Sequence, residues 1–155
     1  MIREQPQFGI VIHRPVQDVY DFVMDLPKTP LWRPRMSDVA WVGEGEPGIG
    51  SRFRVTARAL GYSFRFSFEV TEWEPPVWFA YRQDRGPITM HSGMQWVPEN
   101  DGCRFLIGGN PQAGNFLVKL AEPLLWATLI KQNAADLVRL KEIMESGAAK
   151  NHEAR

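Results

Sequence analysis

The chain has one cysteine, three histidines and no surplus of charge of either sign. Cys103 has no partner within the chain, which excludes a disulfide scaffold. The histidines, His13, His91 and His152, do not stand at the short spacing of metal ligands, so we expect no metal site and no cofactor. Lys and Arg number 18, as do Asp and Glu, and this neutrality argues against a nucleic-acid partner.

Long apolar runs are missing as well. No window of about 20 apolar residues could form a transmembrane segment, and the N-terminus lacks the apolar run of a signal peptide, so we expect a cytoplasmic protein. Residues 1–146 are expected to form a single domain, since domains of about 100–150 residues are common. Residues 147–155 lack large apolar side chains, which predicts a disordered tail. The sequence does not decide between a monomer and a homodimer.

Aromatic residues are abundant: nine Phe, six Trp and three Tyr. Many of them occupy alternate positions, a period of two that is typical of half-buried antiparallel strands. The clearest example is 62–74, where Tyr62, Phe64, Phe66 and Phe68 share one face and polar side chains share the other. Further strands are predicted over 8–13, 39–42, 52–59, 77–83, 90–97 and 103–108.

Two helical regions flank the strands. A helix is predicted over 16–26, after Arg14-Pro15, and the proline-rich segment 27–34 allows at most a short helical turn. A loop is predicted over 109–114. A long helix is predicted over 115–145, which Pro123 should kink or divide. Consecutive antiparallel strands with helices gathered on one side indicate an α+β fold.

Five strings occur in a characteristic order: RPVQDVYDFVMDL (14–26), LWRP (31–34), GIGSRF (48–53), VTEWEPP (70–76) and DGCR (101–104). With the element order, they make the chain resemble the START-like (SRPBCC) superfamily, in its polyketide cyclase/dehydrase branch, over residues 7–146. The resemblance implies a helix-grip fold. In this fold a curved antiparallel sheet of about seven strands wraps around a long C-terminal helix, with two short helices after the first strand.

The strands present more inward apolar side chains than one helix can cover, which predicts a cavity that binds a hydrophobic or aromatic small molecule. The resemblance implies the same, with a lipid, polyketide or isoprenoid-like ligand. Any one of these side chains is more usually plain core. The candidate ligand-binding residues are Trp32, Phe53, Val55, Tyr62, Phe64, Phe66, Phe68, Phe79, Tyr81, Met90, Met94, Trp96, Leu125, Leu129 and Asn133.

Two alternatives stay open. The first is a polyketide aromatase/cyclase or dehydratase that uses the same cavity, with Tyr62 or Tyr81 as proton donor. No acid–base pair with readable geometry is present, which favours binding. The second is a protein-interaction module on the outer face of the sheet, although a solvated face is the simpler interpretation of its arginines, Arg52, Arg54, Arg58 and Arg65.

Overall fold

The computed structural model describes residues 8–59, 61–83, 88–113 and 116–147. Its elements follow the predicted order: β1 (Phe8–Ile12), α1 (Val16–Met24), η1 (Leu26–Lys28), α2 (Thr29–Trp32), β2 (Met36–Val42), β3 (Arg52–Ala59), β4 (Tyr62–Glu74), β5 (Trp78–Gln83), β6 (Ile88–Glu99), β7 (Gly102–Ala113) and α3 (Phe116–Ser146). The predicted loop at 109–114 is wrong, because β7 continues to Ala113 and pairs with β6 along its whole length. Of the predicted tail, 148–155 lie outside the described residues.

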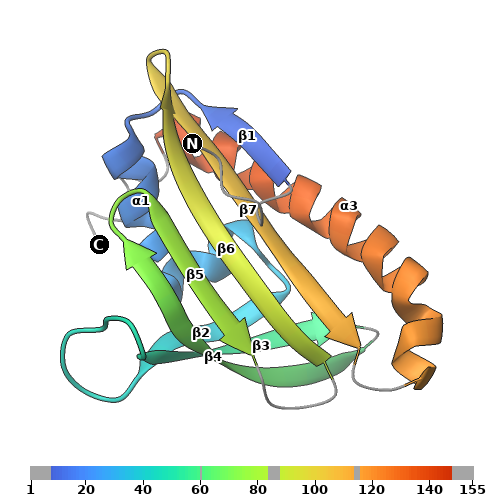
Figure 1. Cartoon of the computed structure of the whole chain (residues 1–155). Helices are drawn as coiled ribbons and strands as arrows, with labels where there is room; N and C mark the ends of the chain where they lie inside the picture. Colours follow the sequence, from blue (N-terminus) through green and yellow to red (C-terminus); the bar gives the residue numbers. More distant parts are fainter. Residues whose placement is uncertain (1–7, 60, 84–87, 114–115, 148–155) are drawn as a thin grey trace.

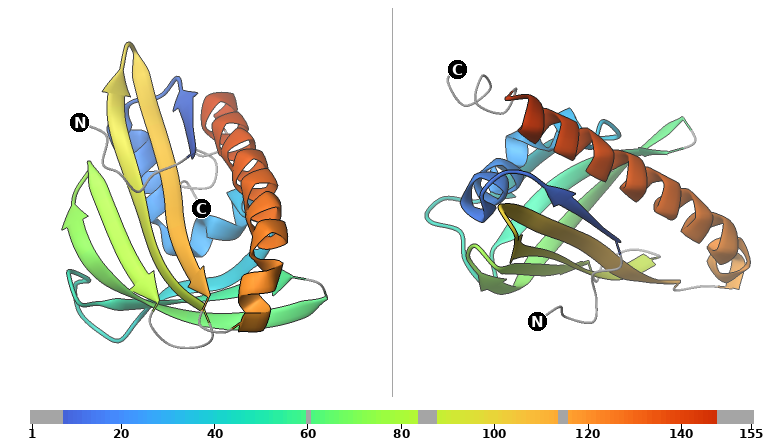
Figure 2. Two further views of the ribbon diagram at one scale, coloured as in Figure 1. Left: turned by 45° about the vertical axis from the view of Figure 1, so that its right-hand side comes forward. Right: turned by 90° about the horizontal axis from the view of Figure 1, so that it is seen from above.

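The seven strands form one antiparallel sheet in the order β1-β7-β6-β5-β4-β3-β2. Strands β2 to β7 follow one another as neighbours, and β1 adds to the far side of β7. The sheet curls around a concave side that holds α1, η1 and α2, while α3 runs diagonally past β1 and β7 (Figures 1 and 2). This arrangement confirms the predicted helix-grip fold.

Helix α3 is continuous, with Pro123 inside it, so the predicted division does not occur. Its C-terminal half is attached to the N-terminal part of the chain by two charge-assisted hydrogen bonds. Lys141 Nζ donates to the carbonyl oxygen of Val11 at 2.7 Å, and Arg14 Nη1 donates to that of Met144 at 2.7 Å. In the described residues, no helix combines the length and the apolar character needed to cross a membrane.

One end of the concave side is solid core. Trp96 is almost fully buried, with its ring centroid 5.0 Å from that of Tyr20 and 5.3 Å from that of Phe105. The ring nitrogen of Trp73 donates to the Tyr20 hydroxyl at 2.9 Å. Edge-to-face and tilted aromatic contacts of this kind add to the free energy of burial.

Candidate ligand-binding site

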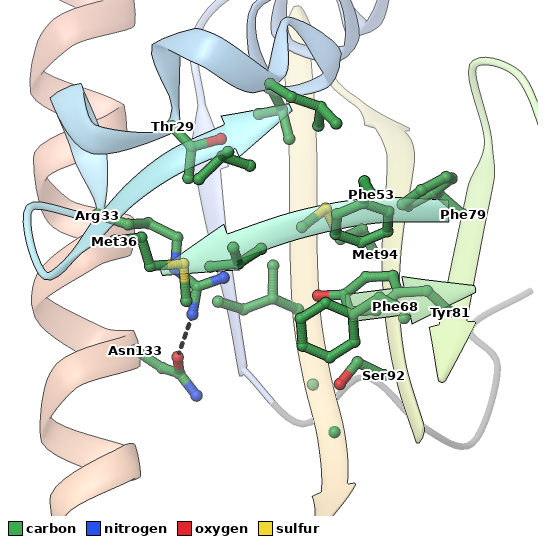
Figure 3. A pocket seen from close by; sticks show the side chains of 18 of the residues that line it. Thr29, Arg33, Met36, Phe53, Phe68, Phe79, Tyr81, Ser92, Met94 and Asn133 are labelled. Carbon is green, nitrogen blue, oxygen red and sulfur yellow. Dashed lines mark hydrogen bonds between the residues drawn. The ribbon is translucent and has the colours of Figure 1, made fainter. Parts of the chain in front are cut away.

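The other end of the concave side contains a cavity of about 160 Å³, shown in Figure 3. An apolar cavity of roughly 150 Å³ is large enough to hold benzene, so this space suits a small ring compound. Its wall is formed by α1, η1, α2, α3 and the concave face of the sheet. The lining residues are Phe8, Val23, Met24, Leu26, Thr29, Trp32, Arg33, Met36, Val39, Phe53, Val55, Phe68, Phe79, Tyr81, Met90, Ser92, Gly93, Met94, Ile107, Gly108, Gly109 and Asn133.

The register of β5, β6 and β7 places their wall residues side by side, in rows that cross the three strands. Tyr81 pairs with Ser92, and Ser92 pairs with Gly109, so one row presents two hydroxyls and a position without a side chain. A Cβ atom on Gly109 would lie 2.7 Å from Ser92 Oγ, too close for an unshifted contact. Glycine at 109 therefore makes room for the Ser92 hydroxyl.

The apolar part of the wall is largely aromatic. Phe53 and Phe68 face each other across β3 and β4, with ring centroids 5.3 Å apart. The ring of Tyr81 packs edge-on against both, at 5.1 Å from each. These contacts fix the Tyr81 ring, so the position of its hydroxyl is determined by the sheet.

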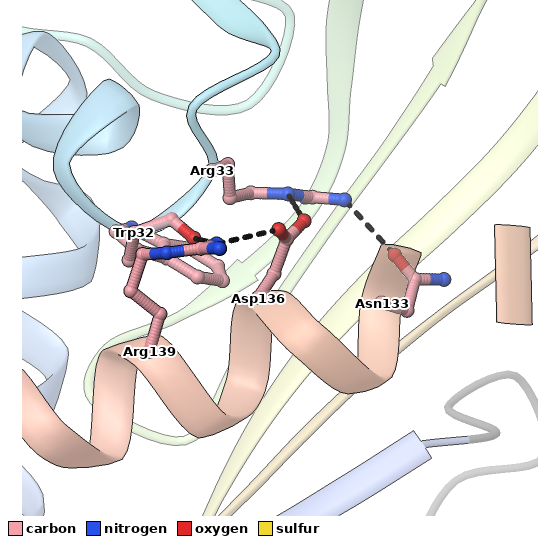
Figure 4. Close-up of polar contacts among 5 residues, drawn as sticks. All are labelled: Trp32, Arg33, Asn133, Asp136 and Arg139. Carbon is pink, nitrogen blue, oxygen red and sulfur yellow. Dashed lines mark hydrogen bonds and ion pairs between the residues drawn. The ribbon is translucent and has the colours of Figure 1, made fainter. Parts of the chain in front are cut away.

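Arg33 is the one charged side chain among the described residues that line the cavity. It follows α2 directly, where its backbone N–H donates to the Thr29 carbonyl at 2.8 Å. Its guanidinium donates through Nε to Asp136 Oδ2 at 3.2 Å and through Nη2 to Asn133 Oδ1 at 3.1 Å (Figure 4). Because Asn133 and Asp136 are three residues apart on α3, they lie on the same face of the helix.

Asp136 is shared between two arginines. Its other oxygen accepts from Arg139 Nη1 at 3.3 Å, and the same nitrogen donates to the Trp32 carbonyl at 3.2 Å. Burial raises the pKa of the Asp136 carboxyl above its ordinary value, and the neighbouring charges of Arg33 and Arg139 act against that rise. With Asp136 ionised, two guanidinium groups face one carboxylate, and this three-residue cluster carries one net positive charge.

The Tyr81 hydroxyl lies on the other side of the cavity from α3, near Ser92 (Figure 3). Burial raises the pKa of Tyr81, while the charge of Arg33 and hydrogen bonding with Ser92 and Arg33 lower it in part. The phenol therefore stays protonated at neutral pH and has a proton to donate to a ligand oxygen.

Many of the candidate residues named from the sequence surround this space. Those that line the cavity are Trp32, Phe53, Val55, Phe68, Phe79, Tyr81, Met90, Met94 and Asn133. Whether they contact a ligand stays a prediction. Period-two alternation placed the strand residues among them, because the side chains at every second position of a strand point to the same face.

Other candidate residues lie away from the cavity. Tyr62 is 70% exposed and Phe64 is 47% exposed, because this end of β4 extends beyond the elements that cover the concave side. Phe66 is half-buried but does not line the cavity, and Trp96 belongs to the solid core. Leu125 and Leu129 lie in α3, but their side chains are outside the described part of the structure.

Sequence reasoning missed three polar lining residues, Arg33, Ser92 and Thr29. Alternation could have identified Ser92, since it lies two residues from both Met90 and Met94 and therefore on the same face of β6. Arg33 follows a helix in an irregular segment, where no period shows which way a side chain points. Only the fold brings it to Asn133 and Asp136, which are about 100 residues away in the chain.

Other sequence features take no part in the cavity. Burial raises the pKa of the Cys103 thiol to about 11, which keeps it protonated and unreactive. Among the described residues, no group of three or more His, Cys, Asp or Glu side chains could hold a metal ion. Of the outer arginines, Arg52 pairs with Glu69 at 3.2 Å and Arg54 with Asp38 at 3.0 Å. A protein-interaction role for this face stays a prediction.

Solved structures similar to this one share its fold at low sequence identity. A protein of Thermus thermophilus, TTHA0849, matches with a TM-score of 0.76 and 19% identity over 90% of this chain and 96% of its own. The Zhui aromatase/cyclase from Streptomyces sp. R1128 matches with a TM-score of 0.73 and 16% identity, covering 91% and 93% of the two chains. The di-domain ARO/CYC protein BexL, from the BE-7585A biosynthetic pathway, matches with a TM-score of 0.72 and 18% identity over 94% of this chain and 48% of its own.

The sequence itself carries the family signal. No curated protein sequence matches the chain significantly. The family model described as polyketide cyclase/dehydrase and lipid transport, however, matches residues 7–145. This match spans nearly all of the described fold and confirms the resemblance noted in the sequence. The chain therefore belongs to the polyketide cyclase/dehydrase and lipid transport family.

Proposed function

We propose that the protein binds a small hydrophobic or aromatic molecule in the cavity between the sheet and α3. The observation that carries this proposal is an unfilled space of about 160 Å³ whose wall is predominantly apolar. Moving apolar ligand surface from water into such a wall contributes roughly 25 cal/mol per Å². In this conformation the volume favours a single substituted ring over a polycyclic compound. Lipid, polyketide and isoprenoid ligands would enter only in part.

Propylbenzene is a suitable neutral probe, with binding measured by isothermal titration calorimetry. Met90 lines the cavity, whereas its neighbour His91 is exposed on the other face of β6. We expect Met90→Trp to fill the space and weaken binding at least tenfold, and His91→Trp to bind like the wild type. Urea denaturation would verify that both variants fold. Failure of the wild type to bind, or equal binding by both variants, would contradict the proposal.

A second candidate is ring closure or dehydration of a polyketide-like substrate in the same cavity. The observation that favours it is Tyr81, a protonated phenol beside the Arg33 guanidinium, both of which line the space. Tyr62, the other proton donor considered, is too exposed to take this role. The described lining residues include no carboxylate or imidazole that could remove a proton from carbon, so binding remains the leading proposal.

Turnover can be tested with a linear poly-β-ketone thioester, followed by mass spectrometry and absorbance of the aromatic product. If the protein is a cyclase, the wild type should speed product formation and Tyr81→Phe should reduce the rate at least tenfold. A rate equal to that of the uncatalysed reaction would exclude this activity for that substrate and leave the binding function in place.

A further inference from the structure

The charge of the cavity carries an inference about the ligand, one that rests on the proposed binding function. Arg33 brings a positive charge to the wall, and no acidic side chain among the described lining residues faces it. Among the described residues, the carboxylate that pairs with Arg33 is Asp136 on α3, which also pairs with Arg139. The cavity therefore presents an excess of positive charge in a region of low dielectric, where an unbalanced charge interacts strongly.

The Arg33 guanidinium also has N–H donors that its protein partners do not use. Arginine carries five N–H groups. Asp136 and Asn133 take one each from Nε and Nη2, and hydrogen bonding with Tyr81 uses a third, so two remain for a ligand. Figure 3 shows the head of Arg33 pointing from the α2 side into the cavity, opposite Tyr81 and Ser92. Because the Arg33 guanidinium and the Tyr81 hydroxyl are within hydrogen-bond reach of each other, one ligand oxygen beside them could accept from both. Paired acceptors in one plane, as in a carboxylate, match the fork of a guanidinium.

The remaining wall fits the other end of such a molecule. Phe53, Phe68 and Phe79 supply ring faces and edges, and the volume of about 160 Å³ accommodates one ring with a short chain. We propose that the cavity selects small aryl or short-chain carboxylic acids, with the carboxylate held by Arg33 and Tyr81 and the apolar part against the phenylalanines. Neutral analogues of the same shape would bind more weakly, and cations would be excluded.

The test compares 3-phenylpropionate with 3-phenylpropionamide, which has the same shape but no charge, by calorimetry at pH 7.5. We expect the wild type to bind the acid at least tenfold more tightly than the amide. Arg33→Met should bring the ratio of the two affinities close to one. Arg58→Met, which removes an exposed arginine from β3, should leave the ratio at the wild-type value. Urea denaturation of each variant would show that the fold is retained.

Asp136→Asn separates a charge effect from a structural one. It removes the carboxylate that partly neutralises Arg33 while keeping an oxygen that can accept its hydrogen bond, so the acid-to-amide ratio should rise. A fall in this ratio would contradict the charge argument. Equal wild-type affinity for acid and amide, with propylbenzene still bound, would overturn the acid selectivity alone. Failure of all three compounds to bind would overturn the proposed function as well.

Discussion

The N-terminal half of α3 is the more apolar half in sequence, but the buried side chains described in this helix lie in its C-terminal half. In the C-terminal half, Leu140 and Met144 are 0% and 1% exposed. In the N-terminal half, Leu124 is 73% exposed and Ile130 is 47% exposed. The C-terminal half lies beside β1 and is fixed to the N-terminal part of the chain, while the other half extends past the sheet (Figures 1 and 2).

The boundary between these halves is where the candidate site lies. Asn133 and Asp136 occupy it, four residues and one residue before the buried Leu137. Apolar content by itself therefore does not show where a helix forms core. The helix forms core where the sheet meets it, and its polar side chains reach Arg33 at the edge of that contact.

Replacing buried and exposed leucines of α3 should give the largest difference between the halves. We expect Leu140→Ala to lower the free energy of unfolding by about 3 kcal/mol, since it removes buried methyl groups and leaves a void. Leu124→Ala should change it by less than about 0.5 kcal/mol, as is usual for exposed positions. Urea denaturation followed by circular dichroism measures both. Equal losses would show that the N-terminal half also packs against the protein.

The attachment of the C-terminal half can be tested next. Lys141→Met removes the donor to the Val11 carbonyl, and a hydrogen bond from a charged group contributes about 1.5–3 kcal/mol. We expect a loss of unfolding free energy near the lower end of that range, because methionine keeps part of the packing. Lys131→Met, at an exposed position of the other half, is the matched control and should have little effect. A similar change in both variants would argue against this attachment.

The smallest expected effect is on the pH dependence of stability, through Asp136 at the boundary between the two halves of α3. The pKa of Asp136 is raised in the folded protein, mainly by burial. The folded state therefore binds a proton at pH values where the unfolded state has already lost it, and stability from this group rises as pH falls from the folded pKa toward the lower pKa of the unfolded state. The stability of Asp136→Asn relative to the wild type should accordingly be highest near pH 7 and decrease on acidification. Urea titrations between pH 4.5 and 7 would test this, and a difference that grows on acidification would show the sign to be wrong.

Much of the fold was predictable because its strands are regular. Alternation over 62–74 matched β4 from Tyr62 to Glu74, and the alternation within 52–59 and 77–83 assigned Phe53, Phe79 and Tyr81 to the concave face. The same alternation could not show that Tyr62 lies beyond the covered part of the sheet. Alternation shows on which face of a strand a side chain lies, whereas the burial of that side chain depends on which other elements cover the face.

The sequence by itself determined the class of the fold, the order of its elements and the aromatic character of its inner wall, because short-range periodicity and turn residues encode these locally. Only the tertiary structure decided which inner side chains border empty space and which form solid core. It also brought Arg33 to Asn133 and Asp136 and to the neighbourhood of Tyr81 and Ser92. The physical reason is that a cavity and its charge arise from contacts between distant segments, whose relative placement no local pattern specifies.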